Sequence, residues 1–518
     1  MNVAGLLSRA ALQHGESPAV RFGERSITYG ELSGRAMRLG RALVELGLEP
    51  GDRVALLQAN GTAMVESMFG VWAGGMTIVP INNRTNAREA AYVIENCDAR
   101  AVIFGGEFED DLLDALEDPG SLRLVSLDGD GRSDSYEDLI ATTDPLAQVT
   151  ERGPDETAWL FYTSGTTGRP KGAMLSHRNL RQMVLSHLAD VRSFEPGEPV
   201  LHAAPLSHGS GCVLLSCISR GACNVIFPHR SFDGGKVLEA VRAEGIRSIA
   251  FVAPTQIVVL NRAAAGDPGG AGLTLESVCY GGAPMFAEDL RDAMTTFGPV
   301  FVQIYGQGEA PMTISVLAIS DHVRFEADGD PRITSAGLPR TDVEIRVIDE
   351  DGAELPVGRR GEVVVRGDVV MTGYWDNAEA TSEALSDGWL RTGDIGLVDE
   401  TGYLHLLDRS KDLIISGGNN IYPREVEEAL LAMPEIEANA VIGVPDPFWG
   451  ESVHALVVPR EGAELTEEAV IEHCRTVLSS YKKPRTVEFL PELPTNAYGK
   501  VLKRELRAER SVGETRKA

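Results

Sequence analysis

The hydrophobic and polar positions of the first two-thirds of the chain follow two alternating patterns. Short, mostly apolar runs are typical of strands buried on both faces, and they occur at residues 54–57, 77–80, 101–104, 224–227 and 248–252. Between such runs, residues 87–96 and 177–191 space their apolar side chains as an amphipathic helix does. Alternating strands and helices predict parallel sheets covered by helices, which is an α/β fold.

The pattern changes at about Thr341. Residues 342–348 and 361–366 alternate apolar and polar side chains with a period of two, and Asp351 and Gly352 form a turn signal between them. Such alternation is typical of strands with one buried and one exposed face. We therefore expect an antiparallel, β-barrel-like segment in this part of the chain.

A second boundary is expected near Asp408. Beyond it, the pattern predicts helices at residues 423–432, 467–481 and 502–509, and strands at 438–443 and 454–458. A chain of 518 residues is too long for one hydrophobic core of ordinary size. The sequence therefore predicts a large N-terminal domain over residues 1–408, with parallel α/β sheets and the β segment, and a small α+β C-terminal domain over residues 409–518.

The charge balance restricts the partners. The chain has 48 lysine and arginine residues against 76 aspartate and glutamate residues, which gives a formal net charge of −28 at pH 7. This charge disfavours diffuse binding to nucleic acid or to an anionic membrane surface. A polyanionic substrate such as ATP then needs a local site of backbone amides, lysine and metal. We expect no nucleic-acid partner and no integral membrane association.

The sequence favours a reduced, cytoplasmic protein. No apolar run approaches the length that spans a bilayer, and the first residues lack the basic-then-apolar pattern of a signal peptide. The six cysteines include no CxxC pair, and we interpret Cys212, Cys217 and Cys223 as small core residues. The sequence leaves the oligomeric state open, and a homodimer is one of the states considered.

The strongest chemical signal is at residues 160–172, which read LFYTSGTTGRPKG. An apolar strand leads into a loop of hydroxyl residues and glycines that ends at Lys171. Glycine lets the backbone approach a phosphate closely, and successive amides form an anion nest. Hydroxyls and the Lys171 ammonium add donors. We therefore interpret residues 162–172 as a polyphosphate loop rather than a surface turn, although it is not a Walker P-loop.

This loop resembles the signature phosphate loop of the adenylate-forming (ANL) superfamily, which includes acyl-CoA synthetases, nonribosomal-peptide adenylation domains and beetle luciferases. Further segments follow in the implied order: YGGAP at 280–284, YGQGE at 305–309, DGWLRTGD at 387–394, DRSKD at 408–412, SGGNNIYP at 416–423 and PTNAYGK at 494–500. They are similar to the family's adenine-side loop, Tyr-Gly-x-Thr-Glu segment, ribose-binding segment, interdomain hinge with its following strand, and catalytic-lysine loop. The resemblance covers essentially the whole chain and implies a mobile C-terminal domain.

The resemblance implies a nucleotide site for ATP and AMP built from these segments. Its residues are Thr163, Ser164, Gly165, Thr166, Thr167, Gly168, Lys171, Gly282, Ala283, Pro284, Tyr305, Gly306, Gln307, Gly308, Asp394 and Arg409. Tyr305 offers adenine a flat face, and Asp394 offers two oxygens to the ribose hydroxyls. Glu309, with Thr163, is the implied Mg²⁺ site, because a hard carboxylate suits magnesium on phosphates.

The implied catalytic residues are Lys500, Glu309 and His208. Lys500 would offset the charge that builds up as the substrate carboxylate meets the α-phosphate. The ring of His208 would gate the acyl pocket, since a carboxylate substrate is already ionised and needs no general base. Considered alone, Lys500 could be a solvated lysine on a loop, Glu309 an acid at the start of a helix, and His208 a partly buried structural histidine.

Some positions allow other interpretations or depart from the family pattern. Asp394 alone is compatible with a β-turn aspartate, and Arg409 with a salt bridge to a neighbouring aspartate in DRSKD. The family usually has threonine at the position of Gly308, so a hydroxyl is missing here. It often has threonine where Tyr498 stands, a change that leaves Lys500 in place.

By family position the acyl pocket includes His208, Val252, Gly281 and Met312. The pocket segments, 207–213, 251–257, 281–283 and 306–312, are mostly small and apolar, with no arginine or lysine for a second carboxylate. This favours a fatty or aromatic monocarboxylate over a dicarboxylate. The resemblance further implies Lys411 as the hinge and Ser416, Gly417 and Gly418 as the wall of a tunnel for coenzyme A.

The implied reaction is an ATP-dependent acid–CoA ligation in two steps. The carboxylate displaces pyrophosphate from ATP, with Mg²⁺ bound, to give an acyl-adenylate; the small domain then swings about Lys411, and the acyl group passes to the thiol of coenzyme A. Three alternatives remain: a stand-alone adenylation enzyme that loads a carrier protein, a luciferase-type oxygenase, and a nucleotide-binding regulator without turnover. Residues 206–211 offer no aspartate for a substrate ammonium, which argues against amino-acid adenylation.

Overall fold

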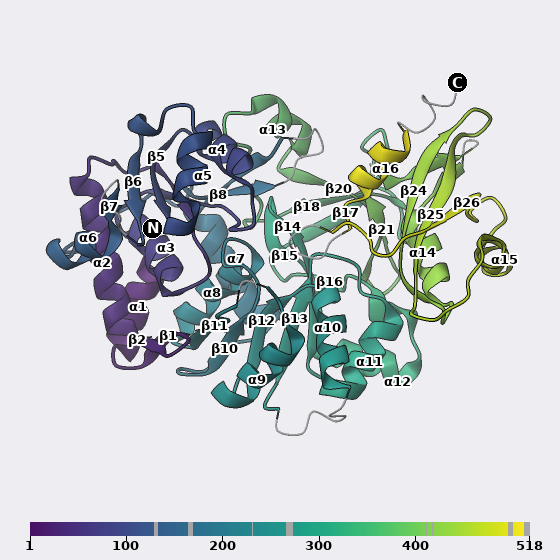
Figure 1. Cartoon of the computed structure of the whole chain (residues 1–518), viewed down its shortest axis with the longest axis horizontal. Helices are drawn as coiled ribbons and strands as arrows, with labels where there is room; N and C mark the ends of the chain where they lie inside the picture. The colour runs from purple at the N-terminus through teal and green to yellow at the C-terminus, as the bar shows by residue number, and fades with distance from the viewer. Residues whose placement is uncertain are drawn as a thin grey trace. The chain divides into compact units, whose positions relative to one another are not determined.

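The structure, a computed structural model, describes residues 1–128, 133–163, 169–229, 231–265, 273–409, 412–416, 419–495 and 501–511. The chain forms two compact units: Met1–Ile345 with Val365–Arg391, and Arg346–Val364 with Thr392–Ala518 (Figure 1). The division into an N-terminal domain over residues 1–408 and a C-terminal domain over residues 409–518, expected from the sequence, stays a prediction.

The first sheet of unit 1 has seven strands in the order β7-β6-β5-β3-β4-β8-β9. Its strands are β3 (Arg53–Leu57), β4 (Thr77–Pro80), β5 (Ala99–Phe104), β6 (Arg123–Ser126), β7 (Asp134–Ser135), β8 (Thr157–Thr163) and β9 (Lys171–Ser176). All pairs are parallel except β8 with β9, which form an antiparallel hairpin. The apolar runs predicted at residues 54–57, 77–80 and 101–104 are therefore confirmed as buried parallel strands.

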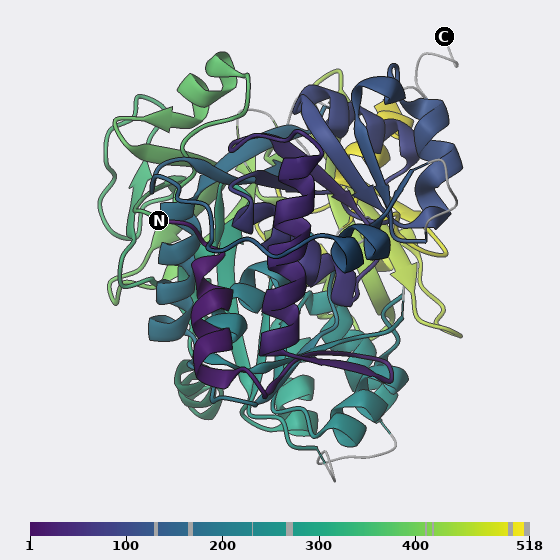
Figure 2. The ribbon, with the colours of Figure 1, turned by 90° about the vertical axis from the view of Figure 1, so that its left-hand side faces the viewer.

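Helices α1 (Gly5–His14), α2 (Tyr29–Glu45), α3 (Thr62–Ala73), α4 (Ala87–Asn96), α5 (Glu109–Ala115) and α6 (Tyr136–Thr142) belong to the N-terminal part of unit 1. Figure 2 shows α1 and α2 side by side. The predicted helix at 87–96 has the bounds of α4, and it begins there because the Asn86 side chain accepts a hydrogen bond from the Glu89 amide.

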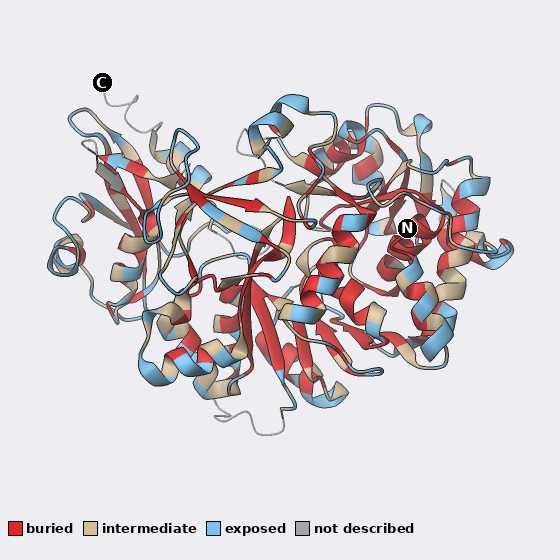
Figure 3. Ribbon diagram, turned by 180° about the vertical axis from the view of Figure 1, so that it is seen from behind, coloured by how far each residue is buried: buried red, intermediate tan, exposed pale blue. Residues whose placement is uncertain are grey.

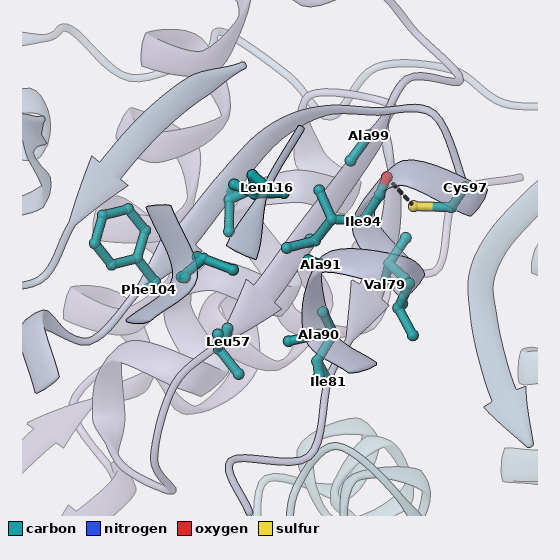
Figure 4. Close-up of a cluster of buried hydrophobic side chains, with 14 of the residues drawn as sticks. Leu57, Val79, Ile81, Ala90, Ala91, Ile94, Cys97, Ala99, Phe104 and Leu116 are labelled. Atoms are coloured by element: carbon teal, nitrogen blue, oxygen red, sulfur yellow. Dashed lines mark hydrogen bonds between the residues drawn. The ribbon is translucent and has the colours of Figure 1, made fainter. Parts of the chain in front are cut away.

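One apolar cluster joins α4 to the strands of the first sheet. Ile94 packs there with Leu57, Val79 and Phe104, and all four are at most 2% exposed (Figure 4). Burying a side chain of this size stabilises the fold by about 1.5–3 kcal/mol relative to its exposure. The Cys97 thiol lies at the end of α4 and donates a hydrogen bond to the Ile94 carbonyl (3.4 Å). The sheet from which the phosphate loop emerges thus rests on a packed core.

The second sheet of unit 1 has nine strands in the order β16-β15-β14-β13-β12-β10-β11-β1-β2. They are β1 (Pro18–Phe22), β2 (Arg25–Thr28), β10 (Pro199–His202), β11 (Cys223–Ile226), β12 (Ser248–Val252), β13 (Ser277–Gly281), β14 (Phe301–Gln307), β15 (Ala310–Leu317) and β16 (Leu338–Pro339). The central run from β14 to β1 is parallel, and β2, β15 and β16 are antiparallel edge additions. Figure 3 shows buried strands beside helices with exposed outer faces.

The remaining helices of unit 1 are α7 (His177–Asp190), α8 (Gly209–Arg220), α9 (Gly234–Glu244), α10 (Pro254–Ala264), α11 (Ala287–Phe297), α12 (Ile319–Asp328) and α13 (Ala378–Ala384). The helix predicted at 177–191 is α7, whose capping box joins the Ser176 and Asn179 side chains to each other's backbone amides. Cys212 and Cys217 in α8, and Cys223 in β11, are buried as expected.

The period-two segment forms the expected strands. A five-stranded sheet has the order β17-β18-β20-β19, with β21 paired to β20; its strands are β17 (Glu344–Ile348), β18 (Gly361–Arg366), β19 (Leu385–Ser386), β20 (Trp389–Val398) and β21 (Leu404–Arg409). At the predicted turn, the Gly352 amide donates to the Asp349 carbonyl (3.1 Å), and Gly352 has φ 83°. Glycine suits such a left-handed position because it lacks a Cβ.

The C-terminal part of unit 2 is an α+β structure. Its sheet has the order β23-β22-β25-β24, with β26 parallel to β25. The elements are β22 (Ile414–Ser416), β23 (Asn419–Ile421), α14 (Pro423–Leu431), β24 (Ile436–Asp446), β25 (Gly450–Pro459), α15 (Glu467–Val477), β26 (Thr486–Phe489) and α16 (Lys503–Ser511). Every helix and strand predicted here is present, although α15 ends at Val477 and not at the expected residue 481.

Candidate functional site

Glu309 is the meeting point of three segments of unit 1. It lies in the turn between β14 and β15 and is 8% exposed. Its Oε1 accepts hydrogen bonds from the Thr163 hydroxyl at the end of β8 (3.1 Å) and from the Tyr374 hydroxyl (2.7 Å). Its backbone carbonyl accepts from the Met371 amide (2.8 Å). The structure thus joins two predicted metal-site residues, Thr163 and Glu309, and adds Tyr374, which the sequence analysis missed.

The donor set around Glu309 fits magnesium on a phosphate substrate. Both hydroxyls donate to Oε1, and no donor among the described residues lies within hydrogen-bond distance of Oε2. The described part of the chain has no group of three or more His, Cys, Asp or Glu residues that could hold a metal on its own. Mg²⁺ commonly uses one or two protein carboxylates and takes its other ligands from water and phosphate. One oriented carboxylate at the phosphate loop meets that requirement.

The two ends of the phosphate loop are held by the β8–β9 hairpin. Thr163 pairs with Lys171 across the hairpin, and the Gly172 carbonyl accepts from the Trp375 amide (2.8 Å). The Lys171 ammonium lies 5.3 Å from the ring centroid of Tyr374, which is within cation–π distance. The loop residues Ser164, Gly165, Thr166, Thr167 and Gly168 lie outside the described residues.

The departure at Gly308 has a steric explanation. A Cβ added there would lie 2.2 Å from Thr163 Cγ2 and 2.9 Å from Phe161 Cδ1, so a side chain requires a shift of these residues. Thr163 cannot move without disturbing its hydrogen bond to Glu309. In this chain, therefore, Gly308 is part of the packing that positions the carboxylate.

We expect Gly308→Thr, which restores the usual family residue, to slow adenylate formation by about 10- to 100-fold, because displacements of about 1 Å at a reacting centre cost this much. Pyrophosphate release measures the effect, and the melting temperature checks the fold. Gly34→Thr in α2 is the matched control, since a Cβ there meets nothing within 4 Å. A folded Gly308→Thr enzyme with wild-type rate would show that the close packing at Thr163 has no role.

His208 lies at the start of α8, next to the strand that enters the phosphate loop. Its ring centroid is 5.1 Å from that of Phe161 in an edge-on contact, and its Nδ1 is hydrogen-bonded to the Ser207 hydroxyl (2.9 Å). Burial lowers the pKa of His208 to about 4, so the ring is neutral at pH 7. A neutral, packed ring is compatible with the predicted gating role and with the absence of a need for a general base.

The surroundings of His202 indicate a structural role. It is fully buried, and its two ring nitrogens are hydrogen-bonded to the Ser210 hydroxyl and the Asn224 amide oxygen, both at 2.9 Å. Burial lowers its pKa to about 4. Its role is therefore to hold the start of α8 against β11.

Close backbone packing surrounds the predicted acyl-pocket residues. A Cβ at Gly306 would lie 2.4 Å from the Met312 amide nitrogen, and one at Gly281 would lie 2.2 Å from the Ile304 carbonyl oxygen. The Met312 sulfur is 3.3 Å from the Cβ position of Gly209, directly after His208. Met312 therefore packs closely against Gly306 and against Gly209, the residue after His208, and Gly281 packs closely against Ile304.

The other predicted nucleotide and pocket residues of unit 1 have these positions. Val252 ends β12 and is fully buried, and Tyr305 in β14 is 8% exposed. Gly282, Ala283 and Pro284 follow β13, with Gly282 at φ 81°. Gln307 ends β14. Their contacts with a nucleotide or an acyl group stay predictions.

The predicted ribose residue, Asp394, belongs to unit 2. Asp394 lies in β20 and is 5% exposed; its amide donates to the Thr392 hydroxyl (3.1 Å), and it pairs with Arg409 of β21. The two aspartates proposed as salt-bridge partners for Arg409 have other contacts: Asp408 accepts from the Arg424 amide (3.0 Å), and Asp412 pairs with Arg507 (2.7 Å). Ser416 ends β22 and is buried.

Several of the site residues predicted from the sequence lie outside the residues that the structure describes. They are the hinge residue Lys411, the tunnel residues Gly417 and Gly418, the catalytic Lys500 and, for its side chain, Arg409.

Comparison with known protein families identifies the class of this enzyme. A family model described as "AMP-binding enzyme" matches residues 7–375, and one described as "AMP-binding enzyme C-terminal domain" matches residues 425–500. The chain belongs to the AMP-binding enzyme family, which confirms the resemblance to the adenylate-forming superfamily and the predicted class of AMP-forming acid–thiol ligases.

Known relatives agree with this assignment. Feruloyl-CoA synthase from Amycolatopsis sp is 40% identical over 504 residues, covering 96% of this chain and 97% of that protein. Long-chain-fatty-acid–CoA ligase FadD13 from Mycobacterium tuberculosis is 33% identical, covering 94% and 93%. ATP-bound MatB from Rhodopseudomonas palustris matches with a TM-score of 0.89 at 32% identity, over 99% of both chains, which confirms the predicted α/β fold class. ATP-dependent ligation of apolar acids to coenzyme A is the reaction that these similarities support.

Among the helices that the structure describes, none is long and apolar enough to cross a membrane.

Proposed function

We propose that this enzyme forms the coenzyme A thioester of an apolar monocarboxylic acid through an acyl-adenylate, and that the acid is aromatic rather than fatty. The observation that carries the proposal is the Glu309 carboxylate, held by the Thr163 and Tyr374 hydroxyls at the end of the phosphate loop. The 40% identity to a feruloyl-CoA synthase, against 33% to a fatty-acid ligase, favours the aromatic class.

The proposed residue roles follow from the site and the resemblance. Glu309 and Thr163 hold Mg²⁺, which when bound would neutralise charge on the phosphates. Tyr374 orients Glu309, and the neutral ring of His208 separates the acyl group from the phosphates. Lys500 stabilises the charge of the adenylation step and leaves when the C-terminal part moves about Lys411. A cytoplasmic location and a homodimer also stay proposals, and light scattering after size-exclusion chromatography tests the latter.

A pyrophosphate-release screen tests the proposed function. Short, medium and long fatty acids and aryl acids are offered with ATP and Mg²⁺, each with and without coenzyme A. We expect turnover that depends on coenzyme A and is highest with aryl acids. Adenylation without transfer to coenzyme A would instead indicate an enzyme that loads a carrier protein. Highest turnover with fatty acids would contradict the proposed substrate class.

A further inference from the structure

A small cavity in unit 1 lies between α7, α8, β15 and the segment after β16, and it has room for about one water molecule. Its lining includes apolar groups and several polar groups. The residues that matter here are His187, Cys212, Ser216, Met312, Thr313 and Arg340.

Four polar atoms of this lining have no hydrogen-bond partner among the described residues: His187 Nε2, Ser216 Oγ, Thr313 Oγ1 and Arg340 Nε. All four side chains are buried, with exposed fractions of 6% for His187, 1% for Ser216, 1% for Thr313 and 2% for Arg340. Buried polar groups in folded proteins nearly always have a partner, either in the protein or in a bound molecule. Four unpartnered polar atoms on residues that line one cavity therefore indicate an occupant that forms hydrogen bonds.

Arg340 is the dominant charge at the cavity. Its Nη2 donates to the Met312 carbonyl (2.7 Å) and its Nη1 to the Ser186 carbonyl (3.3 Å), and no described carboxylate lies within 4.0 Å of it. Burial lowers its pKa to about 10, so the guanidinium is still charged at pH 7. Burial also lowers the pKa of His187, to about 3, so that ring is neutral. The cavity thus offers one strong donor, and its neutral partners can donate or accept.

Met312 connects the cavity to the predicted acyl pocket. Between the pairs Tyr305–Ser315 and Gln307–Ala310 the β14–β15 register shifts, and Met312 lies in this irregular stretch with φ 63°. Strained backbone of this kind in a residue other than glycine is frequent at functional sites. Met312 lines the cavity while its sulfur packs at Gly209, beside the gating ring. Cys212, also in the cavity wall, lies in the segment expected to line the acyl pocket.

We infer, on the basis of the proposed function, that this cavity is a subsite of the acyl pocket that receives a hydroxyl oxygen at the end of the acid remote from its carboxylate, with Arg340 as its donor. The hydroxyl oxygen accepts from Arg340 Nε, and its proton is donated to the Ser216 or the Thr313 hydroxyl oxygen. A single oxygen matches the size of the cavity, whereas a carboxylate or an alkyl terminus does not. The substrate class is then a hydroxylated aryl acid.

Arg340 would add to the acyl pocket a residue that the sequence did not indicate. Arg340 was not among the residues expected to line the acyl pocket, because it follows Met312 by 28 positions and reaches its carbonyl only through the fold.

Matched acids that differ by one hydroxyl test the subsite: 4-hydroxycinnamate with cinnamate, 4-hydroxyphenylacetate with phenylacetate, and 4-hydroxybenzoate with benzoate. For at least one pair we expect the wild-type kcat/KM to favour the hydroxy acid by about 10-fold or more, because a site that hydrogen-bonds a hydroxyl rejects the analogue that lacks it. Thr313→Val and Ser216→Ala should reduce this preference to about 3-fold or less while the deoxy acid keeps its kcat/KM. Thr62→Val is the matched control, since Thr62 in α3 is also buried with an unpartnered hydroxyl but is not in the cavity wall.

Two results would overturn the subsite. One is equal kcat/KM for both members of every pair in the wild type, which would leave the cavity to a water molecule. The other is an undiminished preference in both cavity variants. If no acid supports pyrophosphate release, the proposed function fails. The rise in melting temperature on adding each acid then tests the subsite. The subsite requires a larger rise with the hydroxy acid than with the deoxy acid in the wild type, and equal rises with the two acids in Thr313→Val.

Discussion

Replacing Lys500 with alanine is expected to slow adenylate formation by about 10²–10³-fold, which is the usual cost of removing one donor that stabilises developing negative charge. The reason is electrostatic: a carboxylate and an α-phosphate repel each other as they meet, and the ammonium offsets that repulsion. Single-turnover pyrophosphate release measures this step. Transfer of the acyl group from a synthetic acyl-adenylate to coenzyme A should stay close to the wild-type rate.

Two variants act as controls for Lys500→Ala. Lys483→Ala removes a half-buried lysine elsewhere in the C-terminal part and should leave both half-reactions unchanged. Lys411→Pro stiffens the proposed hinge and should give the opposite pattern, with slow thioester formation and normal adenylation. Equal losses in both half-reactions for Lys500→Ala would refute its proposed role, and equal losses for Lys411→Pro would refute the hinge.

Glu309→Gln is expected to have the second large effect, a loss of about 10²-fold or more in adenylation, because it removes the charge that holds the metal at the phosphates. The amide keeps the size of the side chain and can still accept from the Thr163 and Tyr374 hydroxyls. The Mg²⁺ concentration needed for half-maximal rate should rise. Mg²⁺-dependent ATP binding, measured by calorimetry without an acid, gives a readout independent of turnover.

Tyr374→Phe separates orientation from charge. It removes one donor at 2.7 Å from Glu309 Oε1 but keeps the carboxylate. The expected loss is about 3- to 10-fold, which corresponds to a hydrogen bond worth about 0.5–1.5 kcal/mol.

A Glu309→Gln enzyme with a wild-type Mg²⁺ dependence and melting temperature would show that Glu309 is not the metal carboxylate.

The sequence alone predicted most of the fold correctly. The run at residues 77–80 is β4 and the helix pattern at 87–96 is α4, with the bounds that the sequence suggested. Such elements are set by local spacing, since a continuous apolar run fits a strand covered on both faces and a 3.6-residue period fits an amphipathic helix. The end of α15 was missed, because helix ends depend on capping and on packing at the terminus.

For the functional site, too, some features were predicted from the sequence and others were found only in the structure. The sequence by itself determined the class of enzyme, because six ordered motifs with glycine, hydroxyl, carboxylate and lysine residues need no fold to be recognised. Only the tertiary structure decided that the Tyr374 hydroxyl orients Glu309 and that a buried Arg340 reaches the Met312 carbonyl. Both contacts join segments far apart in the chain, 65 residues apart for Tyr374 and Glu309. A residue's partners across such separations are set by how strands and helices pack, and no local spacing encodes them.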